Sequence, residues 1–261
     1  MARRATARAF AAALAGMGAL LLAGEAAAAL QDEAEVPRLV SFGGACRDCS
    51  LAGRRLVDAK FVGANFAGAS LAGADLRGAS FVGSTFTGAD LGHADVRGGS
   101  IVGGNFVLAS FREARLDGLQ AHGVVFVNAS FNHADADQAD LSASNLTRVD
   151  GREARFDHGV LEHALLIAGR FDHASFRDAR LADARLNGGD FTEADFRGAD
   201  LAGADLTATD LAGASFNGAN LTGANLGGAR GLTQRQLDAS CGDARTLLPP
   251  GLTAPDCRRR R

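Results

Sequence analysis

Six residues that alternate between His and Glu, at intervals of 20, are the side chains of this sequence best suited to chemistry. They lie in the segments LGHAD, FREAR, FNHAD, GREAR, FDHAS and FTEAD and are His93, Glu113, His133, Glu153, His173 and Glu193. Imidazole nitrogens and carboxylate oxygens bind zinc, and His titrates near neutral pH. One interpretation is therefore a metal-binding or pH-responsive surface strip.

Charge complementarity is the plainer interpretation. Beside the first column runs a second one, which contains Asp95, Arg115, Asp135 and Arg155. Residues on neighbouring strands lie about 4.8 Å apart, where alternating charges avoid repulsion and each exposed pair contributes about 0–1 kcal/mol. A straight strip on a flat wall offers two or three ligands per ion and nothing that encloses the ion. We favour the structural interpretation and expect no metal or other cofactor.

A repeat of five residues must position these side chains. From residue 51 to residue 226, Leu or Phe fills 31 of 36 consecutive fifth positions, and the exceptions are Val96, Ile101, Ala121, Ala136 and Gly151. A helix would spread such residues around its axis, and a strand would send them to alternate faces. A period of five instead fits a solenoid in which each pentapeptide turns a corner and every large side chain points inward.

Two further patterns indicate a coil of 20 residues. Phenylalanine recurs at that interval in two sets, which are Phe66, Phe86, Phe106 and Phe126, and Phe156, Phe176, Phe196 and Phe216. Where the large position shrinks to Ala121 or Gly151, the small position two places earlier grows to Leu119 or Val149. Such volume exchange is expected when both positions share one packed interior.

The segments GADLRGAS, GADLAGADL and FNGANLTGANL resemble the pentapeptide-repeat family, whose pattern is A-(D/N)-L-x-x. The resemblance covers about 180 residues. It implies an all-β fold, a right-handed quadrilateral parallel β-helix with four pentapeptides per coil. Residues 51–230 would then form about nine coils, a rod about 43 Å long at about 4.8 Å per coil.

The segments at the two ends of the array are expected to cap it. Residues 30–50 form an N-terminal cap segment, and Arg54, in an inward position, predicts an irregular first coil. Residues 231–261 form a short helical cap and a solvated basic tail, with Thr233 starting a helix that runs to about Ser240 and Leu237 packing on the last coil. This segment resembles the C-terminal caps of exported members of the family.

Four cysteines lie in the two end segments. The rod separates Cys46 and Cys49 from Cys241 and Cys257, so only local pairs are within bridging distance. An even number of cysteines in an exported chain favours disulfides Cys46–Cys49 and Cys241–Cys257 over a metal or redox site.

Residues 1–29 are typical of a secretory signal peptide. Arg3, Arg4 and Arg8 precede the apolar run AFAAALAGMGALLLAG, and small residues follow near Ala28 and Ala29. We expect a periplasmic or secreted protein with no stable membrane span after processing, because the apolar run is short and rich in alanine.

The outward positions favour binding over catalysis. No nucleophile, base and orienting group occur together, so an enzyme with a small-molecule substrate is not expected. Residues 51–230 carry 22 acidic and 16 basic side chains, and the array has no outward aromatic ring, which argues against nucleic-acid binding. Two outward columns of β-branched residues form a candidate partner face for a protein or a second copy: Val62, Val82 and Val102, and Val107, Val127 and Ile167.

Two functional hypotheses follow. The first is a non-enzymatic, exported structural or protein-interaction module of the bacterial envelope, with a metal-responsive strip as a minor variant. The second rests on the family resemblance, because some pentapeptide-repeat proteins mimic duplex DNA and bind DNA gyrase. The signal peptide, the interleaved arginines and the lack of projecting loops favour the first.

Overall fold

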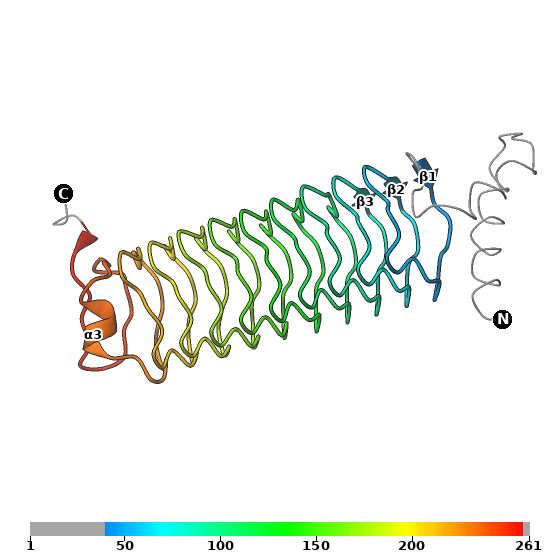
Figure 1. The fold of residues 1–261 in the computed structure, drawn as a ribbon. Helices are drawn as coiled ribbons and strands as arrows, with labels where there is room; N and C mark the ends of the chain where they lie inside the picture. The colour runs from blue at the N-terminus through cyan, green and yellow to red at the C-terminus, as the bar shows by residue number, and fades with distance from the viewer. Residues whose placement is uncertain (1–39, 258–261) are drawn as a thin grey trace, which may run out of the picture.

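Each pentapeptide forms a short extended segment and a turn, and four pentapeptides complete one coil. In the computed structural model, which describes residues 40–257, parallel bridges join residues 20 positions apart, from Ala45–Asn65 to Asp210–Arg230. The chain therefore winds into a rod of stacked, four-sided coils (Figure 1). This is the solenoid predicted from the period of five, in the form of the parallel β-helix that the family resemblance implies.

Only the first coils carry named strands. β1 spans Val40–Phe42, β2 spans Lys60–Val62 and β3 spans Ser80–Val82. β2 pairs in parallel with β1 on one side and β3 on the other, in a register of 20 residues. Elsewhere each wall of a coil contributes a single residue that pairs with the neighbouring coil. A turn precedes and follows that residue, so no longer strand forms.

The turns explain why some outward residues have unusual backbone angles. In most turns the N–H of the next small residue donates to the carbonyl of the large residue, as from Ala94 to Leu91 at 3.1 Å. The N–H groups of Ala64 and Val124 donate instead to a serine hydroxyl of the next coil. The second turn residue has a positive φ, as a type II turn requires, and glycine often stands there. The six His and Glu residues of the predicted strip all occupy this position, with φ between 55° and 60°.

The interior is filled by the large and small positions. The two predicted phenylalanine columns are present, with ring centroids 4.7 Å apart between Phe86 and Phe106 and 5.1 Å apart between Phe156 and Phe176. Leu119 and Val149 are buried, as the volume exchange predicted. At Gly151 the ring of Phe171 also contributes, because it lies 2.5 Å from where a β-carbon would stand.

At its N-terminal end the β-helix begins earlier than the sequence indicated. Residues 40–50, expected to be a cap segment, already pair with the next coil through β1, Ala45 and Ser50. The backbone at Arg54 is also in register, since its carbonyl accepts a bond from the N–H of Asp75 at 2.9 Å. Only the Arg54 side chain departs from the pattern, because it lies exposed to water.

The C-terminal segment covers the last coil. Helix α3, Gln234–Leu237, begins after Thr233, and Leu237 is fully buried. The helix ends three residues before the Ser240 that the sequence suggested. Cys241 and Leu247 then bridge to Asn220 and Asn225, so the cap adds one irregular coil.

Both cysteine pairs form disulfides, Cys46–Cys49 at the front of the rod and Cys241–Cys257 in the cap. The predicted signal peptide, residues 1–29, and the basic tail, residues 258–261, lie outside the described residues. Within residues 40–257, no helix has the length and apolar character needed to cross a membrane.

Candidate interaction surfaces

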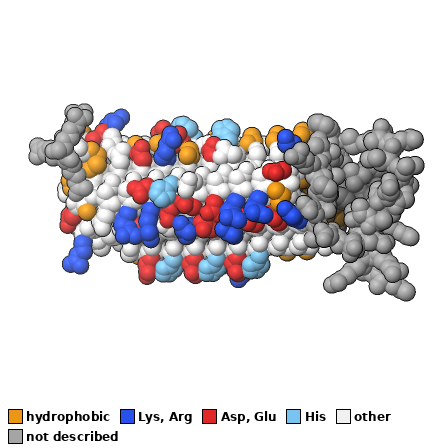
Figure 2. All heavy atoms as spheres, turned by 45° about the horizontal axis from the view of Figure 1, so that its top comes forward, with side chains coloured by type: hydrophobic (Ala, Val, Ile, Leu, Met, Phe, Trp, Pro, Cys, Tyr) orange, Lys and Arg blue, Asp and Glu red, His pale blue; other side chains and the backbone are white. Residues whose placement is uncertain are grey.

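One side of the rod concentrates its charged side chains. The outward residue before each large residue of this side and the outward residue after it form two neighbouring columns, which we call the charged wall. Figure 2 shows the wall as a continuous band of red and blue along the rod. Its members are Asp75, Arg77, Asp95, Arg97, Arg115, Asp117, Asp135, Asp137, Arg155, Asp157, Ser175, Arg177, Asp195 and Arg197.

Three coils of the wall pair an aspartate with the arginine two residues later. Arg77 donates to both carboxylate oxygens of Asp75 at 2.8 and 2.7 Å, and Arg97 holds Asp95 in the same way at 2.8 and 2.6 Å. Arg197 repeats the arrangement on Asp195. Residues on either side of an inward residue point outward together, so the repeat itself brings these partners into contact.

These bonds shift the protonation equilibria of the wall. The hydrogen bonds from Arg77 and Arg97 lower the pKa of Asp75 and of Asp95, although partial burial opposes the shift. Burial also opposes the shift at Asp195, where bonds from Arg197 and Arg177 outweigh it and lower the pKa. These carboxylates therefore stay ionised well into the acidic range.

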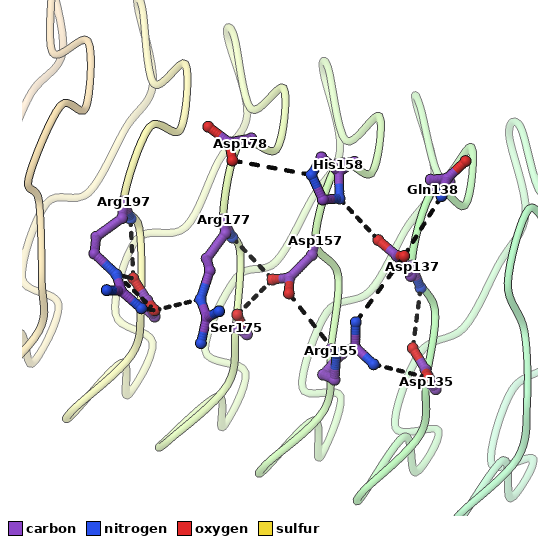
Figure 3. A network of polar contacts seen from close by, with 11 residues as sticks. Asp135, Asp137, Gln138, Arg155, Asp157, His158, Ser175, Arg177, Asp178 and Arg197 are labelled. Carbon is purple, nitrogen blue, oxygen red and sulfur yellow. Dashed lines mark hydrogen bonds and ion pairs between the residues drawn. The ribbon is translucent and has the colours of Figure 1, made fainter.

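The middle of the wall has a different order, because one coil carries two acids, Asp135 and Asp137. The next coil supplies the cations. Arg155 donates to Asp135 at 3.0 Å, and His158 Nδ1 lies 3.0 Å from Asp137 (Figure 3). The hydrogen bond with Asp137 raises the pKa of His158, and Asp178, 3.9 Å away, adds to the shift.

Asp157 ties this cluster to the following coils. It is almost completely buried, and it accepts hydrogen bonds from the Ser175 hydroxyl and from the Arg177 backbone N–H, the latter at 3.0 Å. The Arg177 side chain turns to the next coil and donates to Asp195 at 2.7 Å. Figure 3 shows the resulting network across neighbouring coils, which rests on contacts between residues 18 to 21 positions apart.

The predicted His/Glu strip lies along one corner of the rod, and Figure 2 shows its alternating colours along the lower edge. It resolves into three separate pairs with N–O distances of 3.3 to 3.4 Å, which are His93–Glu113, His133–Glu153 and His173–Glu193. Among residues 40–257 no ion pair joins one pair to the next, and no group of three such side chains is arranged to hold a metal. Two donors per pair are fewer than a zinc site uses.

The second predicted column is part of the charged wall. Arg115 lies 3.8 Å from Asp95, and Arg155 lies 3.0 Å from Asp135, each across one coil. Sequence reasoning missed the partner column. The pattern was available, because the outward residues after the large position read Arg77, Arg97, Asp117, Asp137, Asp157, Arg177 and Arg197 at intervals of 20.

The predicted apolar partner face is partly exposed. Val62 and Val82 are 44% and 39% exposed, whereas Val102, Val107, Val127 and Ile167 are half-buried. Two further exposed residues, Leu108 at 61% and Val125 at 36%, lie beside the second column and were not predicted. Leu108 occupies a turn position that glycine often fills, and that departure from the pattern is the signal that would have found it.

The pentapeptide-repeat model matches this chain in eight copies, which together cover residues 46–98 and 105–230. The chain belongs to the pentapeptide-repeat family. Its fold is accordingly the right-handed quadrilateral β-helix, and the all-β prediction is confirmed. Pentapeptide-repeat proteins are generally structural or interaction modules, and nothing in residues 40–257 shows an enzymatic site.

Several solved pentapeptide-repeat structures are similar to this chain. HetL, involved in heterocyst differentiation regulation in the cyanobacterium Nostoc sp. strain PCC 7120, is 22% identical over 90% of this chain and 98% of its own, with a TM-score of 0.48. QnrB1, a plasmid-mediated fluoroquinolone resistance protein, is 19% identical over 78% of this chain and 93% of its own, with a TM-score of 0.37. At these TM-scores the likeness carries no argument about the role of this chain. No protein with a curated description matches the sequence significantly.

Proposed function

We propose that this pentapeptide-repeat protein is an exported, non-enzymatic structural or interaction module of the bacterial envelope that binds a protein partner, with the charged wall as its contact surface. The observation that carries the proposal is the wall itself. Its charged side chains stand on coils whose backbone is hydrogen-bonded on both sides, for example at Asp95. Little conformational entropy is therefore lost when a partner binds, which favours recognition by a rigid surface.

The charge order of the wall suits a protein better than a nucleic acid. A nucleic acid attracts a surface of one sign, whereas acids and bases alternate here within single coils, as in Asp75–Arg77. Mixed charges of this kind give specificity and orientation in protein–protein contacts. Arginine is moreover enriched in such interfaces.

The alternative hypothesis, a DNA mimic that binds gyrase, receives less support from this arrangement. Duplex DNA presents one negative charge about every 1.7 Å of its axis. On the charged wall an arginine neutralises the aspartate of the same coil at Asp75, Asp95 and Asp195. The one coil with two acids, Asp135 and Asp137, draws Arg155 and His158 from the next coil. The longest acidic run of the wall, Asp117, Asp137 and Asp157, therefore covers only three coils and has an arginine at each end.

Export is supported by the cysteines as well as by the predicted signal peptide. Both cysteine pairs are within bonding distance in the folded chain, and all four described cysteines are in disulfides. Disulfides persist in oxidising compartments and are rare in the reducing cytosol.

The test uses a photo-crosslinking residue at one position of the charged wall in the full-length chain, expressed from its own gene. We expect position 97 to give a discrete adduct in the periplasmic or secreted fraction. The comparison variant carries the same residue at position 87, on the opposite wall and in the column of Val107 and Val127, and should give no adduct if the charged wall is the contact surface. Mass spectrometry of the recovered chain should find a mature N-terminus near residue 30.

Two results would contradict the proposal. An unprocessed chain confined to the cytoplasm would remove the export argument and make a gyrase supercoiling assay the next measurement. Equal adducts from positions 97 and 87, or none from either, would show that the charged wall is not the contact surface.

A further inference from the structure

We infer that the charged wall binds a second copy of the same chain, with the two rods parallel and in register. The inference rests on the proposed function, because it names the partner of the same surface. Five coils carry opposite charges on the two sides of one inward residue. They are the pairs Asp75/Arg77, Asp95/Arg97, Arg115/Asp117, Arg155/Asp157 and Asp195/Arg197.

A two-fold axis along the rod, midway between the two columns, makes this order self-complementary. The axis places each column of one copy opposite the other column of its partner, at the same height. Asp75 of each copy then faces Arg77 of the other copy. Four of these coils gain opposite charges in this way, on each side of the axis, whereas Asp157 is almost completely buried and bonded within its own chain.

Two alternative arrangements of the rods bring like charges together. Along the rod the second column reads Arg, Arg, Asp, Asp, Asp, Arg, Arg from position 77 to position 197, and this order is symmetric about Asp137. Antiparallel rods centred there would therefore oppose Arg77 to Arg197 and Asp117 to Asp157. A parallel slip by one coil would oppose Asp95 to Asp117. Like charges placed opposite each other destabilise a contact, so the pattern disfavours these two arrangements relative to the parallel, in-register one.

The arginines of the wall reach further into the solvent than its aspartates, of which Asp75 at 29% is more exposed than Asp95 at 21% and Asp195 at 18%. The side chains of Arg77, Arg155, Arg177 and Arg197 are about half exposed, at 48, 50, 51 and 49%, even though each already has a partner in its own chain. A guanidinium has five donors, so it can bind a second carboxylate while it keeps the first. A second copy is moreover the partner whose charges recur with the same coil spacing.

The central coil is the exception, since Asp135 would face Asp137 of the partner. In each copy these two acids are already bound by cations of the next coil, Arg155 at 3.0 Å and His158 at 3.0 Å. The network of Figure 3 therefore offsets the one like-charge contact that the symmetric dimer contains.

The experiment is sedimentation equilibrium of the mature chain at low and high salt. Screening shortens the Debye length from about 30 Å at 0.01 M to about 3 Å at 1 M salt. We expect a dimer at low salt whose dissociation constant rises at least about tenfold at high salt, because exposed charges dominate the contact. A chain that stays monomeric at low salt would overturn the inference.

A matched variant tests the orientation. Exchanging the charges within two coils, by D75R, R77D, D95R and R97D, keeps the pair inside each coil and keeps the wall complementary to itself, while the bond from Arg177 to Asp195 stays in place. In a mixture with the unaltered chain, however, the exchanged coils oppose like charges. The variant should thus form dimers with itself as the unaltered chain does, and mixed dimers should be at least about tenfold rarer.

A dye on Lys60, the only lysine of the chain, lets mixed dimers be counted. Free mixing of the two forms would overturn the inference. So would an adduct at position 97 that contains a different protein while the chain remains monomeric, and that result would leave the proposed function standing. Loss of both the dimer and the adduct would contradict both proposals.

Discussion

Position 151 shows how a single residue can break the repeat without breaking the core. The family pattern calls for Leu or Phe there, yet the chain has Gly151. The ring of Phe171, from the next coil, lies 2.5 Å from the place where a β-carbon would stand. Gly169 approaches the same ring from the other side, and a β-carbon there would lie only 2.5 Å from a ring carbon. The large position is therefore already filled by a neighbour.

This packing predicts that the consensus residue harms the protein. Gly151→Leu should lower the free energy of unfolding by about 1–3 kcal/mol, because extra atoms must enter an interior that is full. Urea unfolding followed by circular dichroism measures the change. Stabilisation by Gly151→Leu would contradict the assignment of the space to Phe171.

The control for that substitution is a double variant. Adding Phe171→Leu removes the ring that occupies the space, so Gly151→Leu should cost less in this background than in the natural chain. The difference between the two backgrounds should reach about 1 kcal/mol, as expected for residues in contact. Equal costs in both backgrounds would show that the two positions do not compete.

His158 makes part of the stability depend on pH. Its pKa is raised in the folded chain by the hydrogen bond with Asp137 and by Asp178. Its contribution is thus fully present below the pKa of the unfolded chain, about 6.5, and is lost as the pH rises through the higher folded value. Unfolding midpoints measured between pH 5 and pH 9 (about four points suffice) should show His158→Gln less stable than the natural chain only at the acidic end.

The partner substitution gives the control for this prediction. Asp137→Asn removes the group that raises the pKa, so His158→Gln should have little further effect in that background. A stability loss by His158→Gln that is the same at every pH would indicate a packing role instead of an ion pair.

At the scale of the elements, helix α3 completes the hydrogen bonds of the last coil. In the coils before it, the carbonyl of each small residue accepts a backbone N–H of the next coil, as Ala194 accepts Ser215 at 2.9 Å. For Ala214 that coil is replaced by the cap, and the side-chain amide of Gln236 donates instead, at 2.8 Å. The same amide reaches the carbonyl of Leu211 at 2.8 Å. The Gln236 side chain thereby donates the hydrogen bond that a backbone N–H of a further coil would have given to Ala214.

Replacing that glutamine should expose the end of the rod. Gln236→Leu leaves the Ala214 carbonyl without its donor, and we expect a loss of about 1–3 kcal/mol in the free energy of unfolding. Arg235→Ala, on the exposed side of the same helix, is the matched control and should change stability by less than about 0.5 kcal/mol. Amide hydrogen exchange should be faster in the last coil of Gln236→Leu, and unchanged exchange there would contradict the role of the side chain.

At the scale of the whole molecule, different residues serve folding and recognition: inward residues form the core, and outward residues form the surfaces. The inward positions hold an almost continuous core of Leu, Phe and Ala, and each coil contacts only its neighbours. The outward positions are then available for other tasks, and their order varies from wall to wall. One wall carries the paired charges, and the corner beside it carries three His–Glu pairs. A straight rod keeps such a pattern in register along its length, which is what a self-complementary dimer requires.

Most of the architecture was predictable from local pattern. The period of five, the two phenylalanine columns and Leu237 in the cap follow from the need to bury large apolar side chains, and this need acts at every repeat in the same way. The start of the β-helix at β1 was missed, because residues 40–50 lack the strict Leu or Phe spacing even though their backbone bonds as the later coils do.

The sequence by itself determined which residues face inward and which face outward, because a large side chain every five residues has one place to be buried. Only the tertiary structure decided which outward charges meet. Arg177 turns to Asp195, Arg155 to Asp135 and His158 to Asp137, although each had other charged neighbours. Whether a side chain is buried follows from its own type and position in the repeat. Which ion pair it forms depends on the positions of several charged neighbours that the stacked coils bring within reach. That choice depends on distances of a few ångströms, which exist only in the folded chain.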